Sequence, residues 1–134
     1  MIDDTAGSAA EQLSALRALV ADGRGELAVI RLRRLLQGEP RSIEAQALLA
    51  STLLSLHQPE EALRSADAVV AAEPNNPEGH HLRARVLLQL GQASPALASS
   101  EAAVDREPLV PAYHKALVRA ALRWLKQRIV QDGC

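Results

Sequence analysis

A pattern with a constant step of 34 residues runs through most of this 134-residue chain. The dipeptide Glu-Pro occurs at residues 39–40, 73–74 and 107–108. The same step relates alanines, leucines and turn positions, which are Ala28, Ala62 and Ala96; Leu19, Leu53 and Leu87; and Gly23, His57 and Gly91. A constant period of this length is the signature of an array of helical repeats, in which each unit buries its apolar face against the next. The period therefore predicts an all-α fold.

The residues available for a core also favour helices. The chain is 48% hydrophobic, but Tyr113 and Trp124 are its only aromatic residues, so Leu, Ala and Val must fill the core. These residues suit close contact between helices better than sheet packing. A net charge of −1 offers no overall attraction to nucleic acid or to a membrane, and we expect neither as a partner. No secretory signal or membrane-spanning run is present, so we expect a cytoplasmic protein.

Apolar positions at helical spacing, broken by glycine, proline and capping residues, divide the chain into segments. We predict a disordered tail at 1–8, a repeat domain at 9–130 and a short tail at 131–134. The domain is predicted to hold three helical hairpins and a closing helix, with boundaries at 9–42, 43–76, 77–110 and 111–130. Ser42 and Asn76 are predicted N-caps, because their side chains can accept free backbone N–H groups. Ser94-Pro95 predicts another cap-and-proline helix start.

The three units resemble the tetratricopeptide repeat (TPR) family, which stacks helix–turn–helix units of this length. The matching residues are Leu19, Gly23, Ala28, Leu35 and Pro40 in the first unit; Leu49, Ala50, Leu53, Ala62, Val69 and Pro74 in the second; and Ala84, Leu87, Gly91, Ala96, Ala103 and Pro108 in the third. The resemblance implies a right-handed α-solenoid. The large aromatics common in the family are missing, and Gln12, Gln46, His80 and His114 stand where tryptophan is frequent.

In the TPR family the first helix of each unit lines a concave surface that binds partners. Carried over residue by residue, this implies a groove formed by Arg17, Ser51, Leu54, His81, Arg85, Leu88, Gln89, Lys115, Arg119 and Arg123. Chaperone-binding relatives use a particular Lys, Asn and Arg set, whereas Leu13, Arg17, Leu48, Glu78 and Leu82 occupy those places here. The resemblance therefore does not support a chaperone-type clamp.

The predicted groove becomes cationic toward its C-terminal half. Five potential cations, His81, Arg85, Lys115, Arg119 and Arg123, fall in adjacent columns at the 34-residue step. An acidic partner would relieve the repulsion among them. We therefore expect a protein or peptide ligand with acidic residues and interspersed apolar ones.

The closing helix predicts a second contact surface. Its apolar arc covers roughly half the circumference, which is wide for a helix that only caps the array. We therefore expect part of this arc to contact either a second copy of the chain, as in a homodimer formed through this helix, or a missing downstream segment; the candidate residues are Leu117, Trp124 and Leu125.

Other site types find little support in the sequence. His80, His81 and His114 invite a metal interpretation, but adjacent residues point apart on a helix and no Cys or carboxylate completes a ligand set. No motif places a nucleophile beside a base, so we expect no catalytic site, metal or cofactor. Arg31, Arg33 and Arg34 are interpreted as a solvated face rather than a nucleic-acid site.

Taken together, these patterns predict a non-catalytic scaffold module that binds a peptide or helix of a partner protein in its concave groove. Two alternatives stay open. The chain is an accessory or regulatory domain of an enzyme or multi-protein complex, or it is a self-assembling structural array.

Overall fold

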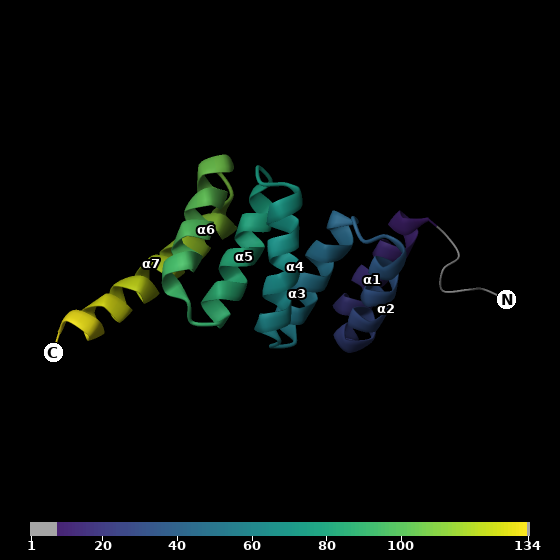
Figure 1. Ribbon diagram of the computed structural model, residues 1–134, viewed down its shortest axis with the longest axis horizontal. Coiled ribbons are helices and arrows are strands. Elements are labelled where there is room, and N and C mark those ends of the chain that lie inside the picture. Colours follow the sequence, from purple (N-terminus) through teal and green to yellow (C-terminus); the bar gives the residue numbers. More distant parts are fainter. Residues whose placement is uncertain (1–7, 134) are drawn as a thin grey trace.

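The computed structural model describes residues 8–133, in which all regular structure is α-helical. The helices are α1 (Ala9–Ala21), α2 (Gly25–Gly38), α3 (Ile43–Ser55), α4 (Pro59–Ala72), α5 (Pro77–Gln89), α6 (Ala93–Arg106) and α7 (Pro111–Asp132). They follow one another along the long axis of the molecule, with α1 and α7 at opposite ends (Figure 1). The predicted all-α solenoid of three hairpins and a closing helix is confirmed.

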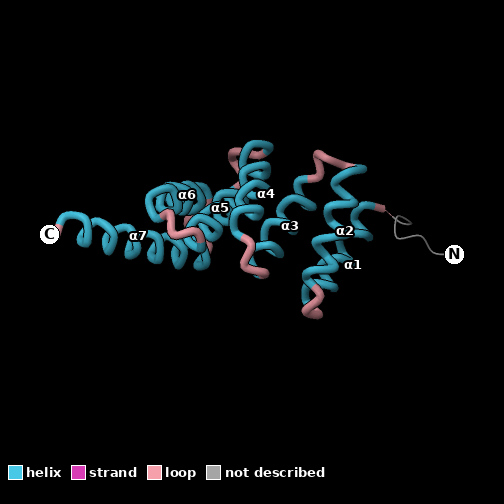
Figure 2. The backbone as a smooth tube through the Cα atoms, turned by 60° about the horizontal axis from the view of Figure 1, so that its bottom comes forward, coloured by secondary structure: helices cyan, strands magenta, loops and turns pink. Residues whose placement is uncertain are grey.

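The array is curved, with the first helix of each hairpin on the inner side. Within residues 8–133 the backbones of α1, α3, α5 and α7 each approach the next member of that series, whereas the backbones of α2, α4 and α6 stay further apart, and the Arg33 and Glu61 side chains bridge α2 and α4. Each second helix instead packs against the first helix of its own hairpin and that of the following one. Figure 2 shows this succession from a second direction, with α7 extending beyond α5 and α6. The inner series therefore forms the concave face.

Local sequence signals explain where the helices begin and end. The Ser42 side chain accepts a hydrogen bond from the Ala45 N–H (3.3 Å), and the Asn76 side chain accepts one from the Glu78 N–H (3.0 Å), so both predicted N-caps are confirmed. Gly23 and Gly91 adopt left-handed φ angles of 80° and 79° at the turns inside their hairpins. These angles cost glycine no side-chain strain.

Three predicted boundaries differ from the structure. Helix α6 begins at Ala93, with Gln92 rather than Ser94 at its N-cap; Pro95 still fits, because its missing N–H lies in the first turn, where no helical acceptor is available. Ser8 caps α1 by accepting from the Glu11 N–H and is no tail residue, while the rest of the predicted tail 1–8 lies outside the described residues. Helix α7 runs on to Asp132, two residues past its predicted end.

Small side chains let the two helices of each hairpin approach closely. Ala28, Ala62 and Ala96 are each 0% exposed. They pack near large buried leucines of the facing helices, including Leu53 and Leu87. A larger side chain would find no room at these crossings.

Two histidines at positions where the resemblance leads us to expect tryptophan form hydrogen bonds to the backbone. The Nε2 atom of His80 lies 2.7 Å from the carbonyl oxygen of Pro74, and the Nε2 atom of His114 bonds to the carbonyl oxygen of Pro108 in the same manner one repeat later. Each histidine thus ties its helix to the loop that precedes it. A hydrogen bond here takes the place of the contact area that an aromatic ring would supply.

Candidate partner-binding groove

The concave face contains a hollow of about 810 Å³ between α3, α5 and α7. Its walls bring together Leu54, Ser55, Arg85, Leu88, Gln89, Arg119, Leu122, Arg123 and Lys126. Six of these belong to the groove implied by the TPR resemblance, namely Leu54, Arg85, Leu88, Gln89, Arg119 and Arg123. The structure thus gathers the C-terminal part of the expected set into one cavity; that the cavity binds a partner stays a prediction.

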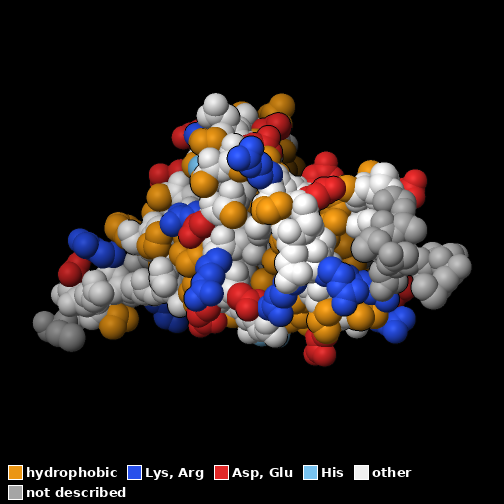
Figure 3. All heavy atoms as spheres, turned by 45° about the vertical axis from the view of Figure 1, so that its right-hand side comes forward, with side chains coloured by type: hydrophobic (Ala, Val, Ile, Leu, Met, Phe, Trp, Pro, Cys, Tyr) orange, Lys and Arg blue, Asp and Glu red, His pale blue; other side chains and the backbone are white. Residues whose placement is uncertain are grey.

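The lining is strongly cationic for its size. Arg85, Arg119, Arg123 and Lys126 contribute positive charge, and no Asp or Glu lines the hollow. Charges gathered in a concave site raise the local potential above that of isolated surface residues. On the face that Figure 3 shows, by contrast, basic and acidic side chains are intermixed, in keeping with the small net charge.

Two hydrogen bonds, related by the 34-residue step, fix side chains along this hollow. The Gln89 amide donates from Nε2 to the Leu54 carbonyl oxygen at 3.3 Å, and Arg123 donates from Nη1 to the Leu88 carbonyl oxygen at 3.4 Å. Both bonds link the inner helix of one unit to the inner helix of the unit before it. Because the bond uses only one of the five guanidinium N–H groups, Arg123 retains donors for a ligand.

His81 does not behave as the groove cation that its place in the repeat predicts. Its ring stacks against Tyr113 with the ring centroids 4.8 Å apart, and it is half-buried. Burial lowers the pKa of His81, the nearby Arg85 charge lowers it further, and Glu78 opposes the shift. The imidazole is therefore mainly neutral near pH 7 and adds no positive charge to the groove. Neither His81 nor the exposed Lys115 lines the hollow.

The N-terminal part of the concave face does not share the cationic lining of the hollow between α3, α5 and α7. Arg17 faces Glu44 across 3.9 Å in an exposed ion pair, and the Ser51 hydroxyl donates within its own helix to the Leu48 carbonyl oxygen. A separate hollow of about 640 Å³ near the start of α1, α3 and α5 is lined by three acids, Glu44, Glu73 and Glu78, and by no Lys or Arg. This hollow is therefore lined by acidic residues, whereas the hollow between α3, α5 and α7 is lined by cations.

Three lining residues, Ser55, Leu122 and Lys126, lie outside the expected groove set. Ser55 and Leu122 stand at the 34-residue step from Gln89 and Leu88, whereas Lys126 does not stand at that step from any expected residue. The position one repeat earlier is Gln92, which lies in the turn after α5 and not on a helix. Helix α7 is longer than the other helices, so its later turns have no counterpart at the 34-residue step. The spacing of Lys126, one turn after Arg123, is the sequence signal that points to it.

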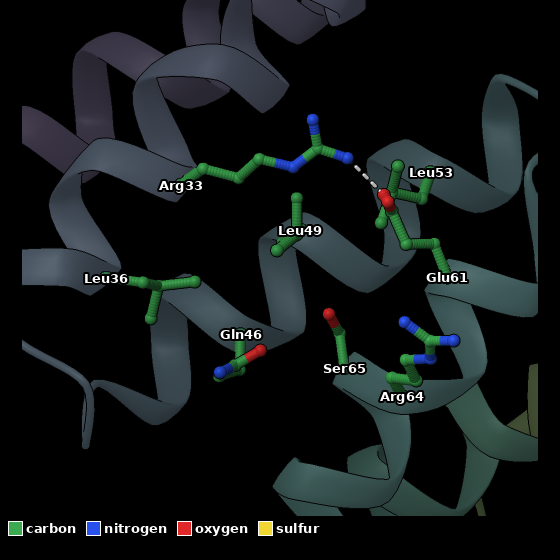
Figure 4. A pocket seen from close by; sticks show the side chains of 8 residues that line it. All are labelled: Arg33, Leu36, Gln46, Leu49, Leu53, Glu61, Arg64 and Ser65. Carbon is green, nitrogen blue, oxygen red and sulfur yellow. Dashed lines mark hydrogen bonds and ion pairs between the residues drawn. The ribbon is translucent and has the colours of Figure 1, made fainter.

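The outer side of the array has a smaller hollow of about 310 Å³ between α2, α3 and α4. Figure 4 shows Gln46, Leu49 and Leu53 of α3 at its floor, with Arg33 reaching across from α2 to Glu61 of α4. These two side chains form an ion pair. The hollow lies beside Gln46, one of the positions where the family often carries tryptophan.

The predicted self-association residues fall on two sides of α7. Leu117 and Trp124 are half-buried, and the Arg128 guanidinium lies over the Trp124 ring at 5.6 Å from its centroid. Leu125 is 48% exposed. Self-association through these residues stays a prediction.

Comparison with known proteins identifies the family. The family model described as tetratricopeptide repeat matches residues 19–86 and 53–122, which together span most of the chain. The chain belongs to the tetratricopeptide repeat family. This confirms the resemblance stated on its repeat residues. No curated protein sequence matches the chain.

Several solved TPR structures share the fold. The first TPR domain of human RPAP3 aligns with a TM-score of 0.82 at 14% identity, covering 87% of this chain and 91% of that one. MamA of Desulfovibrio magneticus RS-1 gives 0.73 at 24% identity, covering 92% and 76%. The second TPR domain of human RPAP3, in complex with the HSP70 peptide SGPTIEEVD, gives 0.76 at 17% identity, covering 81% and 90%. At these identities the likeness establishes the fold alone. No described helix of this TPR chain is long and apolar enough to cross a membrane.

Proposed function

We propose that this TPR chain is a non-catalytic interaction module that holds an acidic segment of a partner protein in the hollow between α3, α5 and α7. The observation that carries the proposal is the lining of that hollow, where four cationic side chains meet without a carboxylate. Exposed like charges held this close repel one another, and an acidic ligand removes the repulsion.

Apolar residues of the hollow define the rest of the ligand. Leu54, Leu88 and Leu122 occupy corresponding positions in three successive inner helices and line the same cavity. A ligand with acidic and apolar residues interspersed would pair its charges with the cations and bury its apolar side chains against these leucines. The solenoid supplies this surface preformed, which limits the entropy lost on binding.

One structural neighbour illustrates this class of ligand. The peptide in the structure of the second RPAP3 domain ends in Glu-Glu-Val-Asp, an acidic sequence with an apolar residue inside it. Here the cations lie on α5 and α7, and the clamp set of chaperone-binding relatives is replaced. We therefore propose the acidic character of the ligand without assigning a chaperone tail. The cytoplasmic location and a role within an enzyme complex remain predictions.

Charge reversal tests the proposal. A fluorescent seven-residue peptide of Glu and Leu, too short for a stable helix of its own, serves as the probe. Replacing Arg85→Glu and Arg119→Glu together should weaken its binding at least about tenfold, and binding to the unmodified chain should also weaken as salt screens the charges over a Debye length of about 8 Å. Fluorescence anisotropy measures both effects.

The matched control reverses two exposed arginines away from the hollow, Arg24→Glu and Arg41→Glu, and so changes the net charge equally. This variant should bind the peptide nearly as tightly as the unmodified chain. Equal loss in both variants would show a non-specific charge effect. Unchanged binding in the Arg85 and Arg119 variant, with its helical spectrum intact, would refute the groove assignment.

A further inference from the structure

Helix α7 exposes a continuous apolar stripe. Val118, Leu122, Leu125 and Ile129 are 55%, 62%, 48% and 68% exposed. Their spacing of four, three and four residues places them on one face of the helix. Outside α7, the only other large apolar side chains with comparable exposure in residues 8–133 are Ile30 and Leu109, which lie singly. A patch of this kind on a monomer marks an interaction site.

The stripe points away from the body of the solenoid. The residues of α7 that are buried against the preceding hairpin are Tyr113, Ala116 and Ala120. At about 100° per residue, the stripe lies on the opposite side of the helix from these three. It therefore forms part of the C-terminal end surface of the array.

Corresponding positions in the earlier hairpins show what covers such a face. Ala84 of α5 and Ala50 of α3 stand one and two repeats before Val118, and each is 0% exposed. Ala50 packs with Ala66 of α4, the second helix of its own hairpin. Val118 has no second helix beside it in the described residues. At Val118 the stripe therefore has the place of a surface that a helix covers, while Leu125 and Ile129 extend it along the later turns of α7, past the point where α5 ends.

The positive charge on α7 favours an acidic partner. Between Pro111 and Val130 the sequence carries five cations, Lys115, Arg119, Arg123, Lys126 and Arg128, and no acidic residue. A second copy of the chain offers one comparable apolar stripe among its described residues, that of its own α7, and pairing the two would bring both sets of cations together. An acidic helix experiences attraction at the same surface.

We infer that the α7 stripe docks an amphipathic helix of another protein, with apolar residues at matching spacing and acidic residues along its edges. Beside Val118 this helix lies where the second helix of a hairpin lies in the earlier units, and it continues along α7 past the point where α5 ends. Its apolar side chains pack against Val118, Leu125 and Ile129, while its acids meet the flanking cations. The inference goes beyond the proposed groove function, because Val118, Leu125 and Ile129 do not line the hollow, although the two surfaces share Leu122, Arg119, Arg123 and Lys126.

A synthetic helix provides the test. The probe is a labelled 18-residue peptide with four leucines at the four-three-four spacing, glutamates beside them and alanine elsewhere; a second peptide carries lysine in place of glutamate. The glutamate peptide should bind the full chain, and the double variant Leu125→Gln with Ile129→Gln should weaken binding at least about tenfold. Ile30→Gln, which removes an apolar side chain of similar exposure on α2, should leave binding unchanged.

The groove variant separates this site from the proposed function. Arg85→Glu changes the hollow and leaves the stripe intact, so it should weaken the short groove peptide and spare the helical peptide. If the helical peptide binds the stripe variant as tightly as the unmodified chain, or if the lysine peptide binds equally well, the inference is wrong.

Two further outcomes would assign the stripe to another occupant and overturn the inference. One is binding of the chain to phosphatidylglycerol vesicles, lost in the stripe variant, while the glutamate peptide does not bind. The other is a dimer in sedimentation that the stripe variant abolishes and the glutamate peptide fails to displace. Circular dichroism checks that the total helical content of the variant matches that of the unmodified chain.

Discussion

At the scale of single residues, His57 is the clearest local conflict in the chain. It occupies the turn inside the second hairpin with a φ of 59°, while Gly23 and Gly91 hold the corresponding turns at 80° and 79°. Left-handed backbone angles cost a side-chain-bearing residue on the order of 1 kcal/mol or more, and glycine avoids that cost. The repeat tolerates the strain because the helices on either side define the turn.

Replacing His57→Gly should therefore raise the free energy of unfolding by about 0.5–1 kcal/mol, measured by urea denaturation. The reverse change, Gly91→Ala, serves as the matched control and should lower it by a similar amount. A Cβ atom at Gly91 would meet no atom within 4 Å, so its effect comes from the backbone angle alone. If His57→Gly does not raise the free energy of unfolding, the backbone strain at this turn is negligible.

At the scale of helices, the close crossings within hairpins set the geometry of the array. Ala62 of α4 and Ala96 of α6 are completely buried where they face α3 and α5. A core packed at the density of a crystal cannot take up extra methylene groups without moving helices. The alanine at this step of the repeat is thus a requirement of packing.

Ala62→Leu and Ala96→Leu should each lower the free energy of unfolding by about 1–3 kcal/mol through overpacking. The control is Ala71→Leu, an exposed position on α4, which should change stability by less than about 0.5 kcal/mol. Thermal and urea unfolding measure all three variants. Crossing variants as stable as the control would contradict the close approach of the helices.

At the scale of the whole molecule, stability depends on how many neighbours each helix has. Helices α3 to α6 are covered on both sides, whereas α1 and α2 form the end of the array. The hollow between α2, α3 and α4 (Figure 4) further reduces the apolar contact that joins the first hairpin to the second. In a linear array, stability is approximately a sum of repeat and interface contributions.

Amide hydrogen exchange should therefore be fastest in α1 and α2 and slowest in α5 and α6 among the helices of the hairpins. Native-state exchange followed by mass spectrometry at peptide resolution measures this order. Filling the hollow with Gln46→Trp should slow exchange in α2 by improving its contact with α3. Equal protection along the whole array would show that it unfolds as a single cooperative unit instead.

Much of the candidate site followed from the repeat step and the family resemblance. Arg85, Arg119 and Arg123 were placed in adjacent columns, and the structure brings them to one hollow. Lys126 escaped the columns because α7 is longer than the helices it repeats. His81 was counted as a potential cation, although its partial burial and its position beside Arg85 lower its pKa.

The sequence by itself determined the helical array, because the period, the caps and the small residues at crossings are local properties that recur at a constant step. It also determined that cations gather in α7, since that follows from composition. Only the tertiary structure decided which of these side chains share a cavity, which face of α7 is left uncovered and that partial burial beside Arg85 lowers the pKa of His81. Exposure, cavity shape and pKa depend on atoms from helices far apart in the sequence, and a repeat pattern does not specify how closely those helices pack.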